Sequence, residues 1–312
     1  LYGGDVLIVN QLYVNTSDTF LCDTNQITVY PYSKFTIVAG AKISFGNMNY
    51  NKEILFPAFD TILIDTTSTV CYLSGGIQRI KGIYYGHLYV NGGAKVMDYN
   101  VSVRGRLYLN TDINVGNYRL TLFHRDTIGS YVGGTVFSSV IGGRIVMSKK
   151  SELLKVYDKN QTVIYPVGTG NVYTPFELTL TSVAFSGISK RGTCMLKCMG
   201  EYEPNHSYDF CSLKKYWITN FDSISSISST FKFTYDISEE YSDSVSRWVG
   251  AQFNNYVMKI DGVVDPVLRT ITFNRNSIYE INGNWTGGVL ANFKCIRWRR
   301  PNEGNKFDNN WN

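Results

Sequence analysis

The stretch from Leu88 to Leu122 repeats on a short period and lacks the apolar spacing of a helix. Apolar and polar residues alternate in short segments, and Gly, Asn and Asp separate these segments. Such alternation between turn residues is typical of strands with one buried face. The segment LYVN at 88–91 returns as LYLN at 107–110, 19 residues later. A repeat of about 20 residues predicts a solenoid, in which each turn buries its apolar face against its neighbours.

A second internal similarity supports repetition. The segment FTIVAGAKISF at 35–45 resembles LYVNGGAKVMDY at 88–99, with Gly-Ala-Lys in both. The two segments are 53 residues apart, which is not a multiple of 19. We therefore expect turns of unequal length, or a loop such as Gly46–Pro57 that interrupts them.

We predict an all-β fold in which a right-handed parallel β-helix at 1–135 precedes an antiparallel β-sandwich at 136–290. The strands expected in the first part before Leu88 are Val6–Val9, Leu12–Val14, Gln26–Tyr30, Phe35–Val38, Lys42–Phe45, Thr61–Ile64 and Val70–Leu73. Longer strands are expected in the second part, at Thr162–Tyr165, Phe176–Ser182, Thr193–Met199, Lys215–Asn220, Thr230–Ile237, Arg247–Phe253, Val257–Ile260, Thr270–Asn274 and Ser277–Ile281. Turn signals fall between them, as at Asn254-Asn255 and Asp261-Gly262. Residues 291–312 are a tail or the start of a next repeat.

The composition favours β structure, with 23 Tyr, 17 Phe and 28 Gly. Charged residues make up 18% and the net charge is +5, too little and too scattered to predict nucleic-acid binding. No apolar run approaches the roughly 18 residues of a membrane helix, so no membrane span is expected. The opening LYGGDVLIVN lacks the pattern of a signal peptide and resembles the middle of a longer sequence. We expect a mature or excised piece of a longer protein.

The even number of cysteines suits an exported protein with disulfides. Cys22 and Cys71 could face each other across stacked turns, and Cys295 could pair with one of Cys194, Cys198 and Cys211. Free buried thiols are the alternative. A zinc site from Cys194, Cys198 and His206 is a weaker one, because there is no second Cys pair at metal-ligand spacing.

We expect no catalytic site and no cofactor. An enzyme on a β-helix, a polysaccharide lyase or glycosidase, needs clustered carboxylates. Asp60, Asp65, Asp98 and Asp112 instead occur at turns or singly, where Asp most often caps the backbone. A glycan-binding surface is a further alternative, with Tyr84, Tyr85, Tyr89 and Tyr108 as candidate platforms, although aromatic ladders also stabilise stacked strands.

The segment TVIYPVGTGNVYTP at 162–175 resembles a motif of large secreted surface proteins of the Bacteroidetes. In that family a "(F/Y)-P-V-G" strand precedes "Y-x-P" and an alternating strand. Leu213–Ile218, Arg247-Trp248 and the segment WTGG at 285–288 resemble later motifs of the same family, and Leu88–Leu122 resembles its adhesin-like β-helix. The resemblance implies export by the type nine route and display outside the cell, with no catalytic residue. The family's O-glycosylation pattern implies candidate glycan sites at Thr61, Thr127 and Ser244.

The two ends of the chain resemble two halves of one family motif. Trp298 to Trp311-Asn312 is similar to its first half, and the segment GGDVLI at 3–8, with Asp5 and Val6, is similar to its second half. Either the chain is one repeat of a tandem array, or its tail completes the N-terminal part of the next subunit. In the second case Trp298 and Trp311 would be anchors, and Arg297, Arg299 and Arg300 would make rim contacts. The plainer interpretations are that the sequence is simply truncated at these ends and that the basic residues belong to a solvated tail.

The sequence therefore predicts a non-catalytic extracellular structural protein. It would be a repeat unit or subunit of a bacterial surface filament or adhesin. Its partners would be copies of itself, head to tail, with surface glycans as a further partner.

Overall fold

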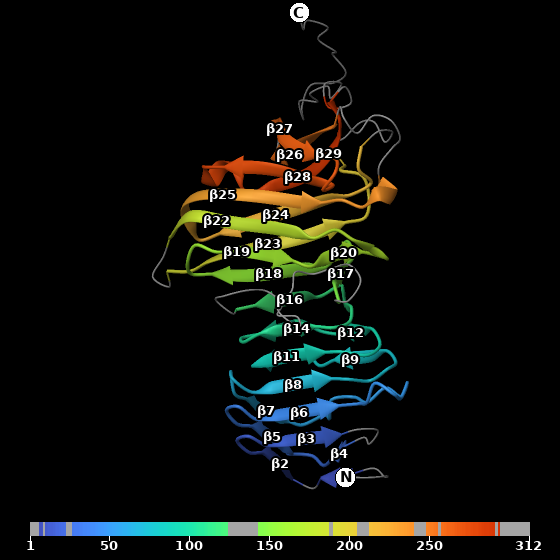
Figure 1. Cartoon of the computed structure of the whole chain (residues 1–312). Coiled ribbons are helices and arrows are strands. Elements are labelled where there is room, and N and C mark those ends of the chain that lie inside the picture. Colours follow the sequence, from blue (N-terminus) through green and yellow to red (C-terminus); the bar gives the residue numbers. More distant parts are fainter. Residues whose placement is uncertain are drawn as a thin grey trace, which may run out of the picture.

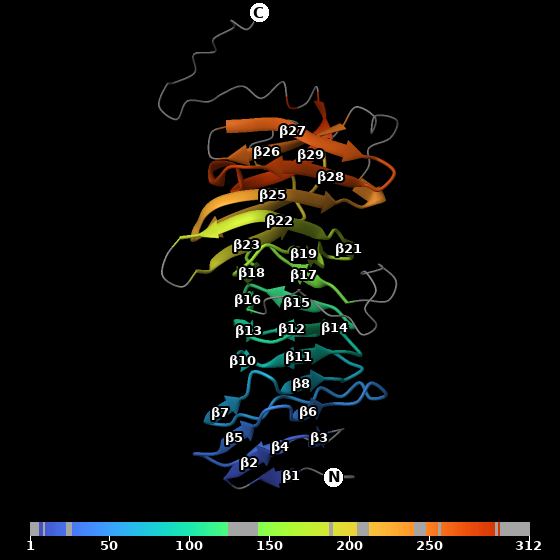
Figure 2. The ribbon, with the colours of Figure 1, turned by 60° about the vertical axis from the view of Figure 1, so that its left-hand side comes forward.

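The computed structural model describes residues 6–8, 10–22, 27–123, 143–186, 190–204, 212–239, 248–254, 257–290 and 293. The molecule is nearly all β and elongated, with the strands lying across its long axis (Figures 1 and 2). We call residues 6–147 the first half and residues 152–293 the second half. In the described parts of the chain no helix is long and apolar enough to cross a membrane.

The first half consists of short strands, and every pairing among them is parallel. They are β1 (Val6–Ile8), β2 (Gln11–Val14), β3 (Thr19–Cys22), β4 (Ile27–Val29), β5 (Lys34–Ile37), β6 (Lys42–Phe45), β7 (Thr61–Ile64), β8 (Thr69–Tyr72), β9 (Gln78–Ile80), β10 (Tyr84–Tyr85), β11 (His87–Val90), β12 (Lys95–Met97), β13 (Val101–Val103), β14 (Leu107–Leu109), β15 (Ile113–Gly116), β16 (Arg119–Leu122) and β17 (Ile145–Met147).

Parallel pairing places equivalent residues of successive strands in columns. In the sheet β3-β6-β8-β11-β14, one column is Cys22, Phe45, Tyr72, Val90 and Leu109, and all five side chains are buried. The next column, from Leu21 to Tyr108, faces the other side of the sheet, because successive side chains of a strand alternate. The alternation read from the sequence therefore becomes continuous apolar stacks inside the first half.

The second half contains longer strands that pair mostly antiparallel. They are β18 (Glu152–Tyr157), β19 (Thr162–Tyr165), β20 (Val167–Thr169), β21 (Val172–Tyr173), β22 (Phe176–Phe185), β23 (Gly192–Met199), β24 (Tyr216–Asp222), β25 (Ile224–Thr234), β26 (Trp248–Asn254), β27 (Val257–Asp265), β28 (Thr270–Arg275) and β29 (Gly283–Val289). Two short 3-10 helices, η1 (Ile237–Glu239) and η3 (Ile278–Glu280), lie between them.

Two sheets join the two halves. One is the 6-stranded sheet β21-β20-β17-β15-β12-β9, and the other has 13 strands in the order β10-β13-β16-β18-β23-β24-β29-β26-β27-β28-β25-β22-β19. The 13-stranded sheet is the larger. It changes from parallel to antiparallel at β18, which pairs with β16 on one side and β23 on the other. Beyond this strand the sheet turns back on itself, so that aromatic rings from its two arms meet. Trp285 of β29 stacks on Phe231 of β25 at 4.7 Å between ring centroids, and Trp217 lies 4.9 Å from Phe233.

The hydrophobic core is continuous from Val14 in β2 to Trp285 in β29. The domain boundary that we predicted near residue 135 falls among residues 124–142, outside the described residues. Of the predicted tail 291–312, Phe293 is described, and its buried ring lies 6.4 Å from that of Phe253 in β26.

Candidate binding groove

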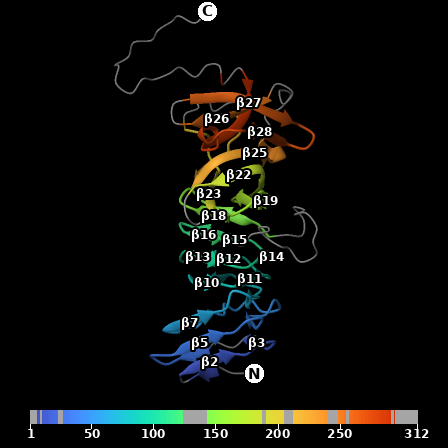
Figure 3. The same ribbon diagram turned by 90° about the vertical axis from the view of Figure 1, so that its left-hand side faces the viewer.

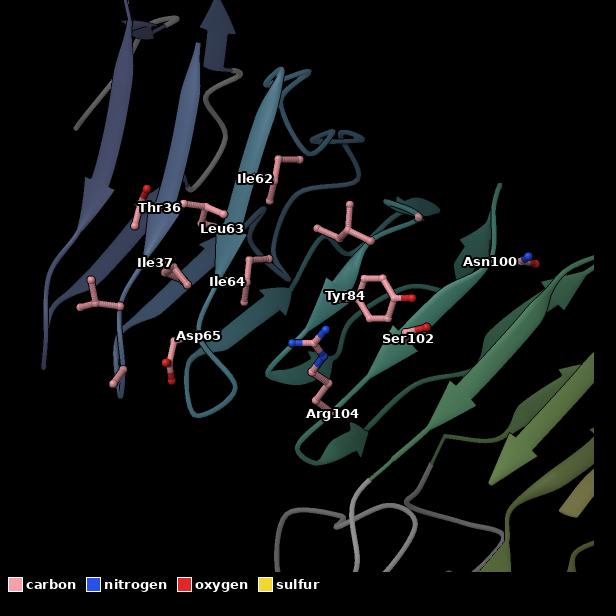
Figure 4. A pocket seen from close by; sticks show the side chains of 14 residues that line it. Thr36, Ile37, Ile62, Leu63, Ile64, Asp65, Tyr84, Asn100, Ser102 and Arg104 are labelled. Atoms are coloured by element: carbon pink, nitrogen blue, oxygen red, sulfur yellow. The ribbon is translucent and has the colours of Figure 1, made fainter. Parts of the chain in front are cut away.

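β7 and β10 lie one above the other in the first half (Figure 3). A groove of about 870 Å³ opens between them (Figure 4). It lies where a sheet is interrupted. β7 is the last strand of the sheet β2-β5-β7, and β10 is the first strand of the 13-stranded sheet. At this level the stack continues through β8 and β11, which pair directly.

In a neighbouring ladder the segment 46–60 contains no strand, and it separates β4 from β9, which are end strands of two different sheets. Its side chains pack inward instead, with the ring of Phe56 5.0 Å from that of Phe45 and the ring of Phe59 stacked on Phe35. Gln78 secures this segment by donating from Nε2 to the carbonyl oxygens of Phe45 and Ile54. This loop therefore fills the core and breaks the ladder between β4 and β9, whereas the break between β7 and β10 lies in another ladder.

The backbone edges on the two sides of the groove lack a strand partner. Thr61 N–H and Asp65 N–H donate to carbonyls at the β5 side, so the peptide groups of Ile62 and Ile64 point the other way, towards the groove. On β10, the carbonyls of Ile83 and Tyr85 accept from Ser102 N–H and Arg104 N–H, which turns the peptide groups of Tyr84 to the groove. Within the described residues no backbone hydrogen bond crosses between these edges.

The groove has the shape of a wedge. It is closed where β10 ends, because a Cβ added at Gly86 would lie 2.2 Å from the carbonyl oxygen of Asp65. His87 N–H also donates to the Ser68 carbonyl at 2.7 Å beside this point. The strands separate from there towards Ile62 and Gly82, both of which line the opening.

The walls of the groove combine apolar side chains with polar ones, and they carry one positive and one negative side chain. Ile62, Ile64 and Ile83 are partly buried against the core, and they reach the surface because no further strand covers them. The outward side chains are more exposed, Leu63 by 48% and Tyr84 by 58% (Figure 4).

The two charged groups lie on opposite sides of the groove (Figure 4). The guanidinium of Arg104 lies 4.8 Å from the ring centroid of Tyr84. The carboxylate of Asp65 accepts from the hydroxyl and the N–H of Thr67 at 2.7 and 2.8 Å. These hydrogen bonds lower the pKa of Asp65, so it is ionised at neutral pH.

The four aspartates considered for catalysis are separate from one another, and each makes its own hydrogen bonds or ion pair. Asp60 accepts from Ser33 N–H at 3.0 Å, Asp98 pairs with Arg79 at 2.9 Å and Asp112 pairs with Arg144 at 2.9 Å. Asp65 alone among these four lines the groove. Among the described residues no group of three His, Cys, Asp or Glu side chains is placed to hold a metal ion.

The tyrosines considered as glycan platforms are also separated. Tyr85 is completely buried, and its hydroxyl shares a hydrogen bond of 2.8 Å with that of Tyr72. Tyr89 and Tyr108 contact each other at 6.1 Å with their rings inclined by 44°. Tyr84 is the one of these four that lines the groove.

The cysteines that the structure describes, Cys22, Cys71, Cys194 and Cys198, are free and buried. The expected pairing of Cys22 with Cys71 is not made. Cys22 is in register with Phe45 and Tyr72, whereas Cys71 is in register with Ser44 and Leu21, on the opposite face. The two cysteines are also two strands apart, about 10 Å at the usual strand spacing, and a disulfide needs less than about 7 Å between Cα atoms.

The spacing of Cys194 and Cys198 also argues against the zinc site. Cys194 and Cys198 occupy the same strand, β23, four residues apart, which separates them by about 13 Å. They therefore cannot both bind one ion. Burial raises the pKa of Cys194 to about 12 and that of Cys198 to about 11, so both are thiols. His206, Cys211 and Cys295 lie outside the described residues.

Most of the residues predicted for assembly or glycosylation also lie outside the described residues. These are Asp5, Thr127, Ser244, Arg297, Trp298, Arg299, Arg300 and Trp311. Val6 belongs to β1 and is in register with Ile27 of β4. Thr61 is exposed at the start of β7, beside the groove.

Sequence reasoning missed the groove itself. The loop Gly46–Pro57, which we expected to interrupt the repeats, separates β4 from β9, and nothing in the sequence indicated that β7 and β10 also lack each other as partners.

No family model matches this chain, and neither a curated protein nor a solved structure matches it. Its function must therefore be argued from its geometry.

Proposed function

We propose that this chain is a non-catalytic structural protein of the cell exterior, a repeat unit or subunit of a bacterial surface filament or adhesin that assembles head to tail. In this proposal the first half is a right-handed parallel β-helix and the second half is an antiparallel β-sandwich. The assignment to Bacteroidetes surface proteins rests on the sequence motifs alone.

Support for the β-helix comes from the register of the strands. β9, β10 and β11 belong to three different sheets, and each pairs with the corresponding strand of the next circuit, β12, β13 and β14. The paired residues are Gln78 with Lys95, Tyr84 with Ser102 and Leu88 with Leu107, so each circuit spans a similar number of residues. This regularity is typical of a solenoid.

The observation that carries the proposal is the continuity of the sheet and the core across the chain. The 13-stranded sheet passes from parallel to antiparallel pairing at β18, and one apolar core accompanies it. An elongated body of this kind resists bending, because bending would break backbone hydrogen bonds along its length. Length and stiffness are what a filament or surface stalk requires.

Support for assembly comes from the outer strands of the first half. In the described part of the chain, β1, β2 and β3 are each an edge strand of their sheet. Open strand edges pair readily with a strand of another chain. A carbohydrate-active β-helix enzyme, the alternative, would require two converging carboxylates, whereas the described lining of the groove includes one.

Electron microscopy of the full chain over a range of concentrations tests this proposal. We expect rods that join end to end, and we expect deletion of residues 291–312 to shorten them sharply. The substitution Trp298→Ala is the milder variant, to be compared with wild type by circular dichroism so that a folding defect is recognised. Rods of unchanged length after the deletion would contradict tail docking, and single particles at every concentration would contradict assembly altogether.

A further inference from the structure

The turn between β27 and β28 carries an exposed apolar tip. Val267 is 85% exposed and Leu268 is 64% exposed, and both follow Pro266. The carboxylate of Asp265 accepts from Val267 N–H and Leu268 N–H, each at 2.9 Å. These two hydrogen bonds fix the backbone of the turn, so little backbone freedom is left to lose when the apolar side chains bind.

We propose that this tip, formed by Val267 and Leu268, inserts into the β7–β10 groove of a second copy of the chain. The inference deepens the proposed function and rests on it, because it supplies a defined contact for self-association. It is separate from the tail contact and involves different residues.

The shape of the groove favours a tip as its occupant. The wedge is closed at Gly86 and Asp65, so a strand cannot pass through it from end to end. A short protrusion can enter from the open side and lie on Ile62, Ile64 and Ile83, which are partly buried residues that pack against the core. When the two aliphatic side chains of the tip contact this surface, apolar area of both is removed from water, which favours association.

The charges beside the two surfaces are complementary. Asp65 and Arg104 line the groove, and Asp265 and Arg269 flank the tip. Each surface thus offers one carboxylate and one guanidinium around an apolar centre. Complementary charges of this kind contribute mainly to the orientation of the partner and less to the affinity.

The contact must form between copies. β7 and β10 lie in the lower part of the molecule and the β27–β28 turn in the upper part, in all three views (Figures 1, 2 and 3). Groove and tip are therefore different patches of one copy. A contact between unlike patches leaves each copy with one free groove and one free tip, so it can continue indefinitely.

The test uses full chains with Leu63→Asp in the groove and Leu268→Asp at the tip. Sedimentation velocity should show self-association about tenfold weaker or more in each variant, as expected when an interface centre is lost. A mixture of the two variants should recover one wild-type contact, because the Leu268→Asp copy keeps an intact groove and the Leu63→Asp copy keeps an intact tip. Tyr279→Asp, at another residue with 81% exposure, is the matched control and should behave as wild type.

The outcomes separate this contact from the proposed function. If wild type associates and both variants associate equally well, the groove contact is overturned while tail-mediated assembly stands. If Leu63→Asp weakens association and Leu268→Asp does not, the groove holds another partner and the tip assignment is overturned. If wild type remains a monomer, both proposals fail. If the mixture recovers nothing although both variants keep their circular dichroism, the pairing of unlike patches is overturned.

Discussion

Lys95 is a cationic side chain that is completely buried inside the first half. Its Nζ donates to the Ser74 carbonyl at 2.9 Å and to the Gly93 carbonyl at 2.8 Å. Burial disfavours the charged form and lowers the pKa of Lys95 to about 8. The side chain sits beside Gln78 in the same column, so two polar residues replace apolar ones next to the loop that interrupts the ladder.

The pKa of Lys95 predicts a particular dependence of stability on pH. Above about pH 8 the folded chain has released a proton that the unfolded chain keeps up to its ordinary pKa of 10.5. The free energy of unfolding should therefore rise with pH in this window, by up to ~3 kcal/mol relative to a Lys95→Met variant. Urea titrations of both proteins at pH 7 and pH 10 measure the difference between their free energies of unfolding. The contributions of the other titrating groups are the same in both proteins and cancel in this difference. A difference that stays constant would show that the buried amine is not neutral at pH 10.

At the scale of elements, the corner between β10 and β11 holds the interrupted ladder together. Gly86 lies against the turn after β7, where an added Cβ would come within 2.2 Å of the Asp65 carbonyl and 2.6 Å of the Ser68 carbonyl. Both contacts are with backbone, which cannot rotate away as a long side chain can. The close approach is what allows β8 and β11 to pair although β7 and β10 do not.

We expect Gly86→Ala to lower the free energy of unfolding by about 2 kcal/mol, because overpacking forces the two backbone segments apart. Gly40→Asn is the matched control. A Cβ added at Gly40 would meet nothing within 4 Å, and its φ of +73° is a conformation that Asn tolerates. The Gly40→Asn variant should unfold within ~0.5 kcal/mol of wild type. Equal effects of the two substitutions in a urea titration would contradict the close-approach argument.

At the scale of the whole molecule, the two halves share two sheets and one core. They join at the pair β17–β20 and at β18, which pairs with β16 of the first half at Leu120–Leu153 and with β23 of the second half at Leu153–Leu196. Leu120, Leu153 and Leu196 are all completely buried. Separating the halves at this point would expose two strand edges and open the core.

We therefore expect β16, β18 and β23 to unfold as one cooperative unit. Native-state hydrogen exchange in increasing urea should show their amides losing protection at the same concentration. The exposed turn at Thr16–Asp18 serves as the reference for amides that exchange without urea. Loss of protection in β16 while β23 remains protected would mean that the two halves are independent domains.

Local pattern was sufficient for many individual strands. β6, β7 and β19 begin and end at the residues that the sequence pattern predicted. Other predictions were wrong because a residue that we assigned to a turn, or to a strand, has another structural role. Asp261-Gly262 lies inside β27, and Gly262 is required there by the approach of Gly250 and the ring of Phe273. The expected strand at 277–281 contains η3, which Ser277 caps through Tyr279 N–H.

The sequence by itself determined the β character of the chain, its short repeats and the interruption after Gly46, because these depend on spacing along the chain. Tertiary structure decided which edges remain unpaired and that the halves share a sheet. It also decided that Asp65 and Arg104 face the same groove although they are far apart in sequence. The physical reason is that alternation depends on spacing along the chain, whereas the pairing of strand edges depends on contacts between residues far apart in sequence.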